Sequence, residues 1–188
     1  MKRYIKPPIF AIILILTVSL LLSCGKEDYY QIGVVLPLSG DHAAKGKSML
    51  KAIELFFQNA NKTGFFKNKK VKLIIEDDKN TSEGARLAAE KIVLNPKIIA
   101  VVGHYYSSAL AGAAEIYNKY GIPVVSPFAS NSIIAKSKWL FSVNVGDKRQ
   151  GEYMAVYLYK ILQKDNVVVI HTNESFGEGL KEGFLDKA

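Results

Sequence analysis

The sequence has a single cysteine, Cys24, among its 188 residues. One thiol cannot close an internal disulfide, and without a cysteine pair the usual zinc and iron–sulfur sites lack ligands. The three histidines are scattered, with no pair at a helical metal-ligand spacing. Proline and glycine occur at ordinary frequencies. This composition excludes a disulfide-stapled scaffold, collagen and low-complexity disorder, and we expect neither a metal nor another cofactor.

Acidic residues are outnumbered, with 17 Asp and Glu against 25 Lys and Arg and a net charge of +8. Four lysines cluster around a predicted turn, at positions 67, 69, 70 and 72. No aromatic residues alternate with them in the spacing of a base-stacking surface. A solvated turn is therefore the better interpretation, and we expect no nucleic-acid partner.

Long apolar runs are absent except for the fourteen uncharged residues 9–22, which follow three basic residues and are followed by Ser23 and Cys24. A membrane-spanning helix needs about 20 apolar residues, so this run fits an export signal better. Its end, LLSC (21–24), resembles a bacterial lipoprotein signal, in which the leader is cut before a cysteine that carries diacylglycerol. We expect a signal peptide over 1–23, a lipid on Cys24 and a tether over 24–30. An ordinary thiol after a signal peptide is the alternative.

After the leader, short apolar runs typical of buried strands alternate with amphipathic stretches typical of helices. Such alternation implies right-handed crossovers and a parallel sheet covered on both faces, so the expected fold class is α/β. Thr81 or Ser82 is expected to cap the second helix, and Ser107 or Ser108 the third. Strands are predicted at 31–36, 71–76, 98–102, 123–126, 140–145 and 167–171, with helices between them and a helix over 150–162.

The last 23 residues, 166–188, hold one predicted strand and part of a helix, which cannot bury a core by themselves. Either this segment docks on the first sheet, or the chain is cut from a longer one. We favour a cut chain.

Ligands of open parallel sheets bind beyond the carboxyl ends of the strands, and two loops expected there are rich in hydroxyls. One brings Ser107 and Ser108 to a helix start, where free N–H groups favour an anion, although capping alone also explains these serines. The other contains Phe128, Ala129 and Ser130. Together the loops offer donors and acceptors for a small zwitterion or amide, with simple turn chemistry as the alternative.

No catalytic set is present, so we expect no enzyme. Ser39 and Gly40 lack the strand–GxSxG–helix frame of a hydrolase, and each histidine is expected to be structural or solvated. The acidic group at 76–78 is expected to bind loop N–H groups or cap the next helix, with metal binding as the minor alternative.

Several ordered segments together resemble the type I periplasmic binding proteins, and most closely the branched-chain amino acid (Leu/Ile/Val) receptors of ABC transporters, a group that includes amide and urea receptors. The segments are IGVVLPLSGDHAAKG (32–46), VVGHYYSSA (101–109), GIPVVSPFASN (121–131), GDKRQGEY (146–153) and VVVIHTNESFGEGL (167–180). The resemblance runs from Ile32 to the last residue.

This resemblance implies two α/β lobes joined by a hinge, which close over a ligand. It divides the chain into an N-terminal lobe (31–145), a hinge crossing and helix (146–165) and the start of a C-terminal lobe (166–188). Most of the second lobe would then be missing.

The resemblance also implies roles for individual residues. Ser107 matches the serine that binds the ligand carboxylate, Ser130 matches a hydroxyl residue with the same task, and the backbone at Phe128 and Ala129 matches the segment that meets the ligand ammonium. Ser108, the next residue after Ser107, is also expected to be a ligand-binding residue.

At two further positions the sequence departs from the family pattern. Phe176 matches an aromatic residue on the second lobe that faces the ligand, but it lacks a hydroxyl. Lys45 stands where many members place an aromatic residue over the ligand, which favours an acidic or polar ligand.

The resulting hypothesis is an extracytoplasmic, lipid-anchored solute-binding protein of the cell envelope that delivers an amino acid or related small polar molecule to an ABC permease. The alternative is a ligand-sensing module of the same fold that signals to a partner protein. An α/β enzyme is a third, weaker hypothesis.

Overall fold

The structure is a computed structural model that describes residues 29–67, 69–130 and 132–188. The predicted signal peptide and the lipidation site at Cys24 lie outside the described residues. The elements are β1 (Tyr29–Leu36), α2 (Ala43–Lys62), β2 (Lys70–Asp77), α3 (Ser82–Val93), β3 (Ile98–Gly103), α4 (Ser107–Tyr120), β4 (Val124–Ser126), β5 (Leu140–Ser142), α5 (Asp147–Val156), η1 (Tyr157–Ile161) and α6 (Ser175–Lys187).

The five strands form one parallel sheet in the order β2-β1-β3-β4-β5. Strand β1 lies inside the sheet and its second half is fully buried, with Val34, Val35 and Leu36 at 0% exposure. The chain therefore winds outward in both directions from β1. The point where the direction changes, between β1 and β3, opens a crevice at the carboxyl ends of these strands.

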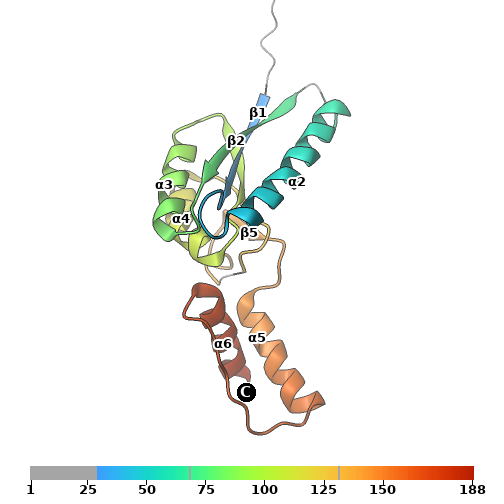
Figure 1. Cartoon of the computed structure of the whole chain (residues 1–188), viewed down its shortest axis with the longest axis vertical. Coiled ribbons are helices and arrows are strands. Elements are labelled where there is room, and N and C mark those ends of the chain that lie inside the picture. Colours follow the sequence, from blue (N-terminus) through green and yellow to red (C-terminus); the bar gives the residue numbers. More distant parts are fainter. Residues whose placement is uncertain (1–28, 68, 131) are drawn as a thin grey trace, which may run out of the picture.

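Helices cover the two faces of the sheet unequally. Helices α3 and α4 pack together on one face and enclose the main core, whereas α2 covers the other face near β1 and β2 (Figure 1). Right-handed crossovers require this division, since α2 precedes a step to one side of β1 and α3 and α4 precede steps to the other. The sheet and its helices confirm the predicted α/β fold.

Several predicted helix boundaries are confirmed. Thr81 caps α3, and its Oγ1 accepts a hydrogen bond of 2.9 Å from the N–H of Gly84. Helix α4 ends at Gly121 in the left-handed conformation. The predicted serine cap of α4 is wrong: Tyr106, in extended conformation, is the N-cap residue, and Ser107 is the first helical residue. A serine in the first turn leaves its hydroxyl free to bond elsewhere.

Helix α2 begins at Ala43, earlier than the apolar spacing indicated. Its first turn packs tightly against the end of β1, since a Cβ at Gly46 would lie 1.9 Å from the carbonyl oxygen of Pro37. At the other end, the Asn61 amide bonds both the N–H and the carbonyl of Val71, at 2.7 and 2.9 Å. These contacts hold α2 along the sheet.

Three predictions for the C-terminal part need correction. Strand β5 stops at Ser142 instead of continuing to 145, and the helix predicted over 150–162 starts at Asp147 and changes to π-helical geometry after Val156. The predicted strand 167–171 has no regular structure. A strand requires a neighbour for its N–H and carbonyl groups, and the described residues form no ladder with this segment.

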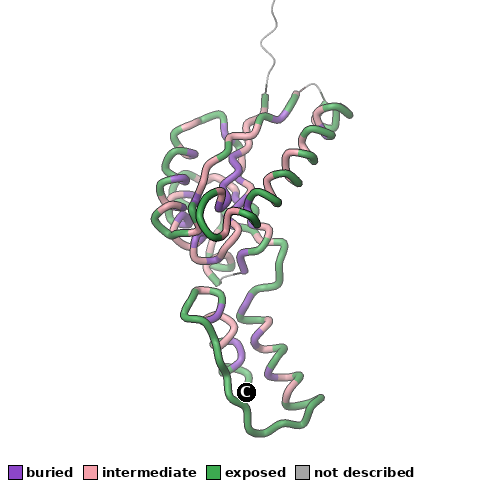
Figure 2. Tube along the Cα trace, viewed as in Figure 1, coloured by how far each residue is buried: buried purple, intermediate pink, exposed green. Residues whose placement is uncertain are grey.

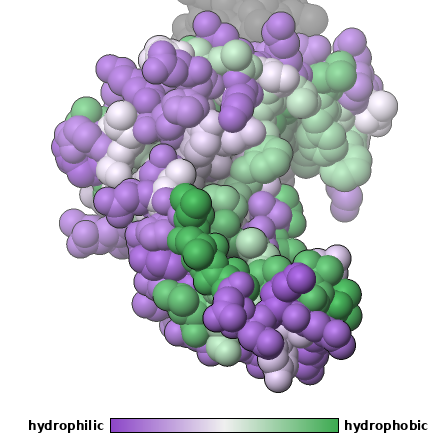
Figure 3. All heavy atoms as spheres, turned by 60° about the horizontal axis from the view of Figure 1, so that its bottom comes forward, coloured by the Kyte–Doolittle hydropathy of each residue, from purple (hydrophilic) through white to green (hydrophobic). Residues whose placement is uncertain are grey.

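Helices α5 and α6 pack on each other beyond the carboxyl end of the sheet (Figure 1). The segment that connects them runs exposed along its whole length from 161 to 174 (Figure 2). When this end of the molecule is brought forward, apolar side chains are seen gathered on its surface (Figure 3). No helix among the described residues has the length and apolarity of a membrane span.

Candidate functional site

The two hydroxyl-rich loops predicted from the sequence meet at the carboxyl end of the sheet. The backbone N–H of Ser130 donates a hydrogen bond of 3.2 Å to Oγ of Ser107. Both serines are buried, at 2% and 6% exposure. Adjacent strands β3 and β4 deliver these loops to the same edge, which is why residues 23 positions apart form a pair.

The hydroxyl of Ser130 is buried and has no hydrogen-bond partner among the described residues. Leaving a buried polar atom unpaired costs about 1–3 kcal/mol. Unpaired groups of this kind are suited to a polar ligand. Ser107 adds to them, since it opens α4, whose first-turn N–H groups have no intrahelical partner.

The loop after β4 is held in place by two further serines. Ser126 Oγ donates to the carbonyl of His104 at 2.6 Å and accepts from the N–H of Ala129 at 3.0 Å. Ser142 Oγ donates to the carbonyl of Ala129 at 2.7 Å, and the Asn144 amide donates to that of Phe128 at 3.3 Å. Each of these two carbonyls keeps one lone pair for a ligand N–H.

An aromatic wall stands beside this loop. The rings of Tyr105 and Phe128 stack with their centroids 4.8 Å apart. They share an open groove with Lys45, whose Nζ lies 5.8 Å from the centre of the Tyr106 ring. The groove lies at the β1–β3 crevice and is lined by Ala44, Lys45, Ser48, Met49, Ala52, Tyr105 and Phe128.

A fully buried polar network lies behind the site. His104 Nδ1 is 2.8 Å from Oδ2 of Asp78, and its Nε2 is 3.2 Å from the hydroxyl of Tyr117. Burial, together with the charge of Asp78, raises the pKa of Tyr117. His104 is thus a structural residue, as predicted, and its carbonyl anchors Ser126.

The acidic group at the end of β2 binds loop backbone, as predicted. Asp77 Oδ1 accepts from the N–H groups of Leu38 and Lys79, both at 2.8 Å. Burial alone would raise the pKa of Asp77, but hydrogen bonds from Ser39 and from these backbone groups hold it below its usual value. Within the described ranges no three His, Cys, Asp or Glu side chains are placed to hold a metal ion.

Asp147, the first residue of α5, contacts the loop of Ser130, and the sequence analysis did not single it out. Its N–H donates to the carbonyl of Ser130 at 3.0 Å, and its buried Oδ2 has no hydrogen-bond partner among the described residues. Burial, reinforced by the charge of Glu182, raises the pKa of Asp147. An Asp directly after Gly146 is a typical helix-start signal, and it was missed because the helix was predicted to begin three residues later.

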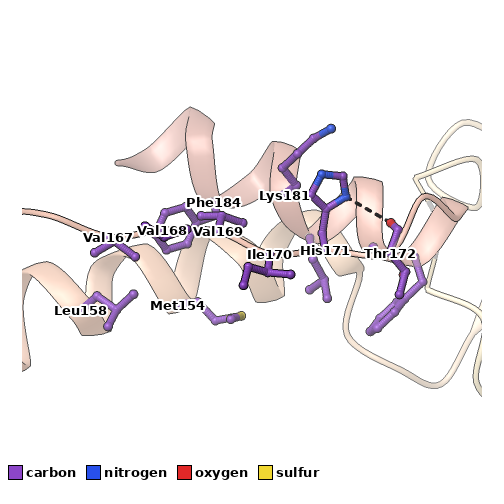
Figure 4. A pocket seen from close by; sticks show the side chains of 13 residues that line it. Met154, Leu158, Val167, Val168, Val169, Ile170, His171, Thr172, Lys181 and Phe184 are labelled. Atoms are coloured by element: carbon purple, nitrogen blue, oxygen red, sulfur yellow. Dashed lines mark hydrogen bonds between the residues drawn. The ribbon is translucent and has the colours of Figure 1, made fainter.

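Two predicted site residues are not joined to the serine pair by any hydrogen bond that the structure describes. The carbonyl of Ser108 accepts from Oγ of Ser82, so its backbone contacts α3. Phe176 lies on α6 in a separate apolar pocket, with Met154 of α5 and the extended segment 167–172 (Figure 4). The structure therefore brings together Ser107, Ala129 and Ser130, places Lys45 and Phe128 on the adjoining groove, and leaves Phe176 elsewhere.

Comparisons with known proteins agree with this architecture. An amino acid binding protein of Pseudomonas aeruginosa is 30% identical over 153 residues, which are 80% of this chain and 41% of that protein. The leucine-specific-binding protein of Salmonella typhimurium is 29% identical over 189 residues, 99% of this chain and 50% of that protein. The chain thus spans about half the length, or less, of these curated relatives.

A solved structure of a binding protein is also similar to this chain. The branched-chain amino acid transporter substrate-binding protein of Streptococcus pneumoniae, in complex with isoleucine, superimposes with a TM-score of 0.75 at 26% identity, over 85% of this chain and 47% of that one. The family model described as periplasmic binding protein matches residues 30–188. The sequence segments, the parallel sheet and these matches agree, and the chain belongs to the periplasmic binding protein family.

Proposed function

We propose that the chain supplies the N-terminal lobe of an extracytoplasmic solute-binding protein that passes an amino acid or related small polar molecule to an ABC permease. The observation that carries this proposal is the buried pair of Ser107 and Ser130 at the carboxyl end of the sheet. Relatives described as amino acid binding and leucine-specific-binding proteins support the class of ligand.

The chemistry of the site suits a zwitterion. The hydroxyl of Ser107, the unpaired hydroxyl of Ser130 and the first turn of α4 offer donors to a carboxylate. The carbonyls of Phe128 and Ala129 offer acceptors to an ammonium group. Lys45, on the same groove as Phe128, favours a ligand whose side chain is acidic or polar.

In this proposal residues 31–145 form the N-terminal lobe, 146–165 the hinge crossing and helix, and 166–188 the start of the second lobe. Phe176 would approach the ligand only when the lobes close, which is consistent with its position on α6 away from the serine pair. Ligand binding stabilises the closed form only to the extent that the ligand binds the closed form more tightly than the open form.

The test is calorimetric titration of the chain with leucine and with glutamate. Ser107→Ala removes a hydrogen bond to a charged group, which is worth about 1.5–3 kcal/mol, so we expect affinity to fall by about 10- to 150-fold. Thr63→Ala is the matched control, because Thr63 is the exposed C-cap residue of α2, at the edge of the sheet opposite to the serine pair. Equal affinity in the Ser107→Ala variant and the control would remove Ser107 from the site.

Transport and sensing share this binding step and differ in the partner. A relative described as a transporter substrate-binding protein favours transport. Co-purification of the native protein with a permease would support transport, whereas co-purification with a signalling protein would support the sensory alternative.

We also propose that Cys24 carries a lipid that holds the protein on the outer face of a membrane of the cell envelope. The basic start, the short apolar run and the cysteine support this proposal. The intact mass of protein extracted from its membranes should equal the chain from Cys24 plus acyl groups. Cys24→Ala should abolish the added mass and release the protein from the membrane, and an unmodified thiol at Cys24 would contradict the proposal.

A further inference from the structure

One edge of the sheet is strongly basic. The amino ends of the parallel strands meet at this edge, together with the segments that lead into them. The segments that lead into β2, β3, β4 and β5, at 60–70, 94–98, 118–124 and 135–140, contain no acidic residue. They carry eight lysines, which we call the basic edge: Lys62, Lys67, Lys69, Lys70, Lys97, Lys119, Lys136 and Lys138.

Exposed apolar and aromatic side chains lie among these lysines. Phe65 is 70% exposed, Leu94 79%, Tyr120 53% and Trp139 38%. Lys119 Nζ lies 5.7 Å from the centre of the Tyr120 ring. Lysine beside aromatic rings is typical of surfaces that rest in the interface of a membrane, where the rings lie among headgroups and the ammonium groups meet lipid phosphates.

The opposite edge has a different character. The carboxyl ends of the strands carry the candidate ligand site, and the loops there hold charges of both signs: the acidic residues Asp41, Asp77, Asp78 and Glu83 and the lysines Lys45 and Lys79. Helices α5 and α6 also lie beyond this end (Figure 1). The lobe is thus polarised along its strands, with positive charge at one end and the ligand site at the other.

The chain enters the lobe at the basic edge. Tyr29, the first residue of β1, lies opposite Lys70 in the parallel register. Residues 24–28 number five and span at most about 18 Å when fully extended, and they include the charges of Lys26, Glu27 and Asp28.

We propose that, when the protein is not engaged with its permease, the basic edge docks on an anionic phospholipid surface and holds the ligand site on the side away from the membrane. This inference rests on the proposed lipid at Cys24. A lipid there would keep the basic edge within about two Debye lengths of the headgroups, where lysines are attracted to anionic lipid. Electrostatic attraction of the lysines would add to the attachment that the acyl chains on Cys24 provide.

The only tryptophan of the chain makes the test direct, because Trp139 lies at the basic edge. The acylated protein is reconstituted in vesicles of phosphatidylcholine alone, or of equal parts phosphatidylcholine and phosphatidylglycerol, that contain a headgroup spin-labelled lipid. We expect quenching of Trp139 fluorescence in the phosphatidylglycerol vesicles at low salt, and recovery of fluorescence at high salt.

A second variant places the tryptophan, whose fluorescence reports contact with lipid, at the carboxyl edge of the sheet. In Trp139→Phe/Val143→Trp the tryptophan follows β5 instead of preceding it, at a position that is 76% exposed. We expect no quenching of this reporter. Equal quenching of both reporters would overturn the proposed orientation.

Charge variants test the lysines themselves. Lys62, Lys67, Lys97 and Lys136 are exposed residues of the basic edge and are replaced together by Gln; the control replaces Lys47, Lys51, Lys160 and Lys164, which are exposed elsewhere. Each lysine near the surface contributes about fivefold to binding, so the first variant should lose quenching that depends on phosphatidylglycerol while the control keeps it. Equal losses would assign the effect to net charge and overturn the proposal.

The two proposals can fail separately. If the intact mass shows no acyl group, the lipid anchor is wrong, and flotation of the same protein with phosphatidylglycerol vesicles still tests the basic edge. If the protein is acylated but quenching is the same in both vesicle types, the lipid alone attaches it and the basic edge has no role.

Discussion

Ser130 and Asp147 each bury a side-chain oxygen that lacks a partner among the described residues, and one hydrogen bond joins their backbones. The two unpaired oxygen atoms differ in whether their group can carry a charge. The Ser130 hydroxyl is neutral and is suited to a ligand, whereas the Asp147 carboxyl is charged at neutral pH unless its environment opposes ionisation. Asp147 faces Gly179 of α6 and the charge of Glu182, so its ionisation is unfavourable in the folded state.

We expect Asp147→Asn to stabilise the protein at pH 7. Because the folded-state pKa of Asp147 is raised, the folded state holds this proton more tightly than the unfolded state. The free energy of unfolding therefore falls as pH rises from 3.8 through the folded-state pKa. Asn is uncharged throughout, and its carbonyl can keep the bond from the N–H of Lys148.

Urea unfolding at pH 3 and pH 7 measures this effect. The variant should gain about 1–3 kcal/mol at pH 7, the scale of an unpaired buried polar group, and the two proteins should converge at pH 3. Asp165→Asn, an exposed position, is the control and should change neither value. If the free energy of unfolding of the variant exceeds that of the wild type by less at pH 7 than at pH 3, the prediction is wrong.

Individual site residues were predictable where strand order alone brings them together. Ser107 and Ser130 follow neighbouring parallel strands, so their proximity follows from the alternation of strands and helices. The partners of their loops were not predictable: Ser142 and Asn144 hold the carbonyls of Ala129 and Phe128 through bonds that depend on loop geometry. Such bonds leave no periodic signal in a sequence.

Helices α5 and α6 approach each other through glycines. A Cβ at Gly151 would lie 2.1 Å from the carbonyl oxygen of Leu180, and one at Gly183 would lie 1.9 Å from that of Lys148. Backbone therefore meets backbone at both crossings. This close contact joins the two helices, together with the buried side chains of Ala155 and Phe184.

We expect Gly183→Ala to push α6 away from α5. The added methyl group would collide with backbone, which cannot move aside as a flexible side chain does, and overpacking of this kind costs about 1–3 kcal/mol. Hydrogen exchange of the α6 amides should rise, and the free energy of unfolding should fall. Lys187→Ala, at an exposed position of the same helix, is the control. Equal exchange in the two variants would show that the crossing tolerates a side chain.

Among the elements, strands with a partner inside the chain were predicted well and the one without a partner was not. The run 167–171 has the composition of a buried strand, yet Val168 and Ile170 are 86% and 93% exposed and no ladder forms there. β-propensity reflects packing against neighbours, so composition predicts a strand only where neighbours exist. Helix starts were misplaced for a related reason, since Gly46 and Asp147 owe their positions to Pro37 and Ser130.

At the scale of the whole molecule, the order of elements was sufficient for the α/β class and the parallel sheet, and the resemblance of ordered segments was sufficient for the family. The polarity of the lobe was not predictable from the lysine cluster alone. Lys97, Lys119 and Lys136 are distant in sequence from that cluster and join it only because parallel strands all begin at one edge.

The bond between the N–H of Asp147 and the carbonyl of Ser130 has a mechanical consequence. It fastens the first turn of α5 to the loop that bears a candidate ligand hydroxyl, and α5 in turn carries α6. A ten-residue helix is about 15 Å long, so a rotation of about 10° at Gly146 moves its far end by about 3 Å. A small displacement of Ser130 that turned α5 at Gly146 would thus be amplified at the far end of the helix.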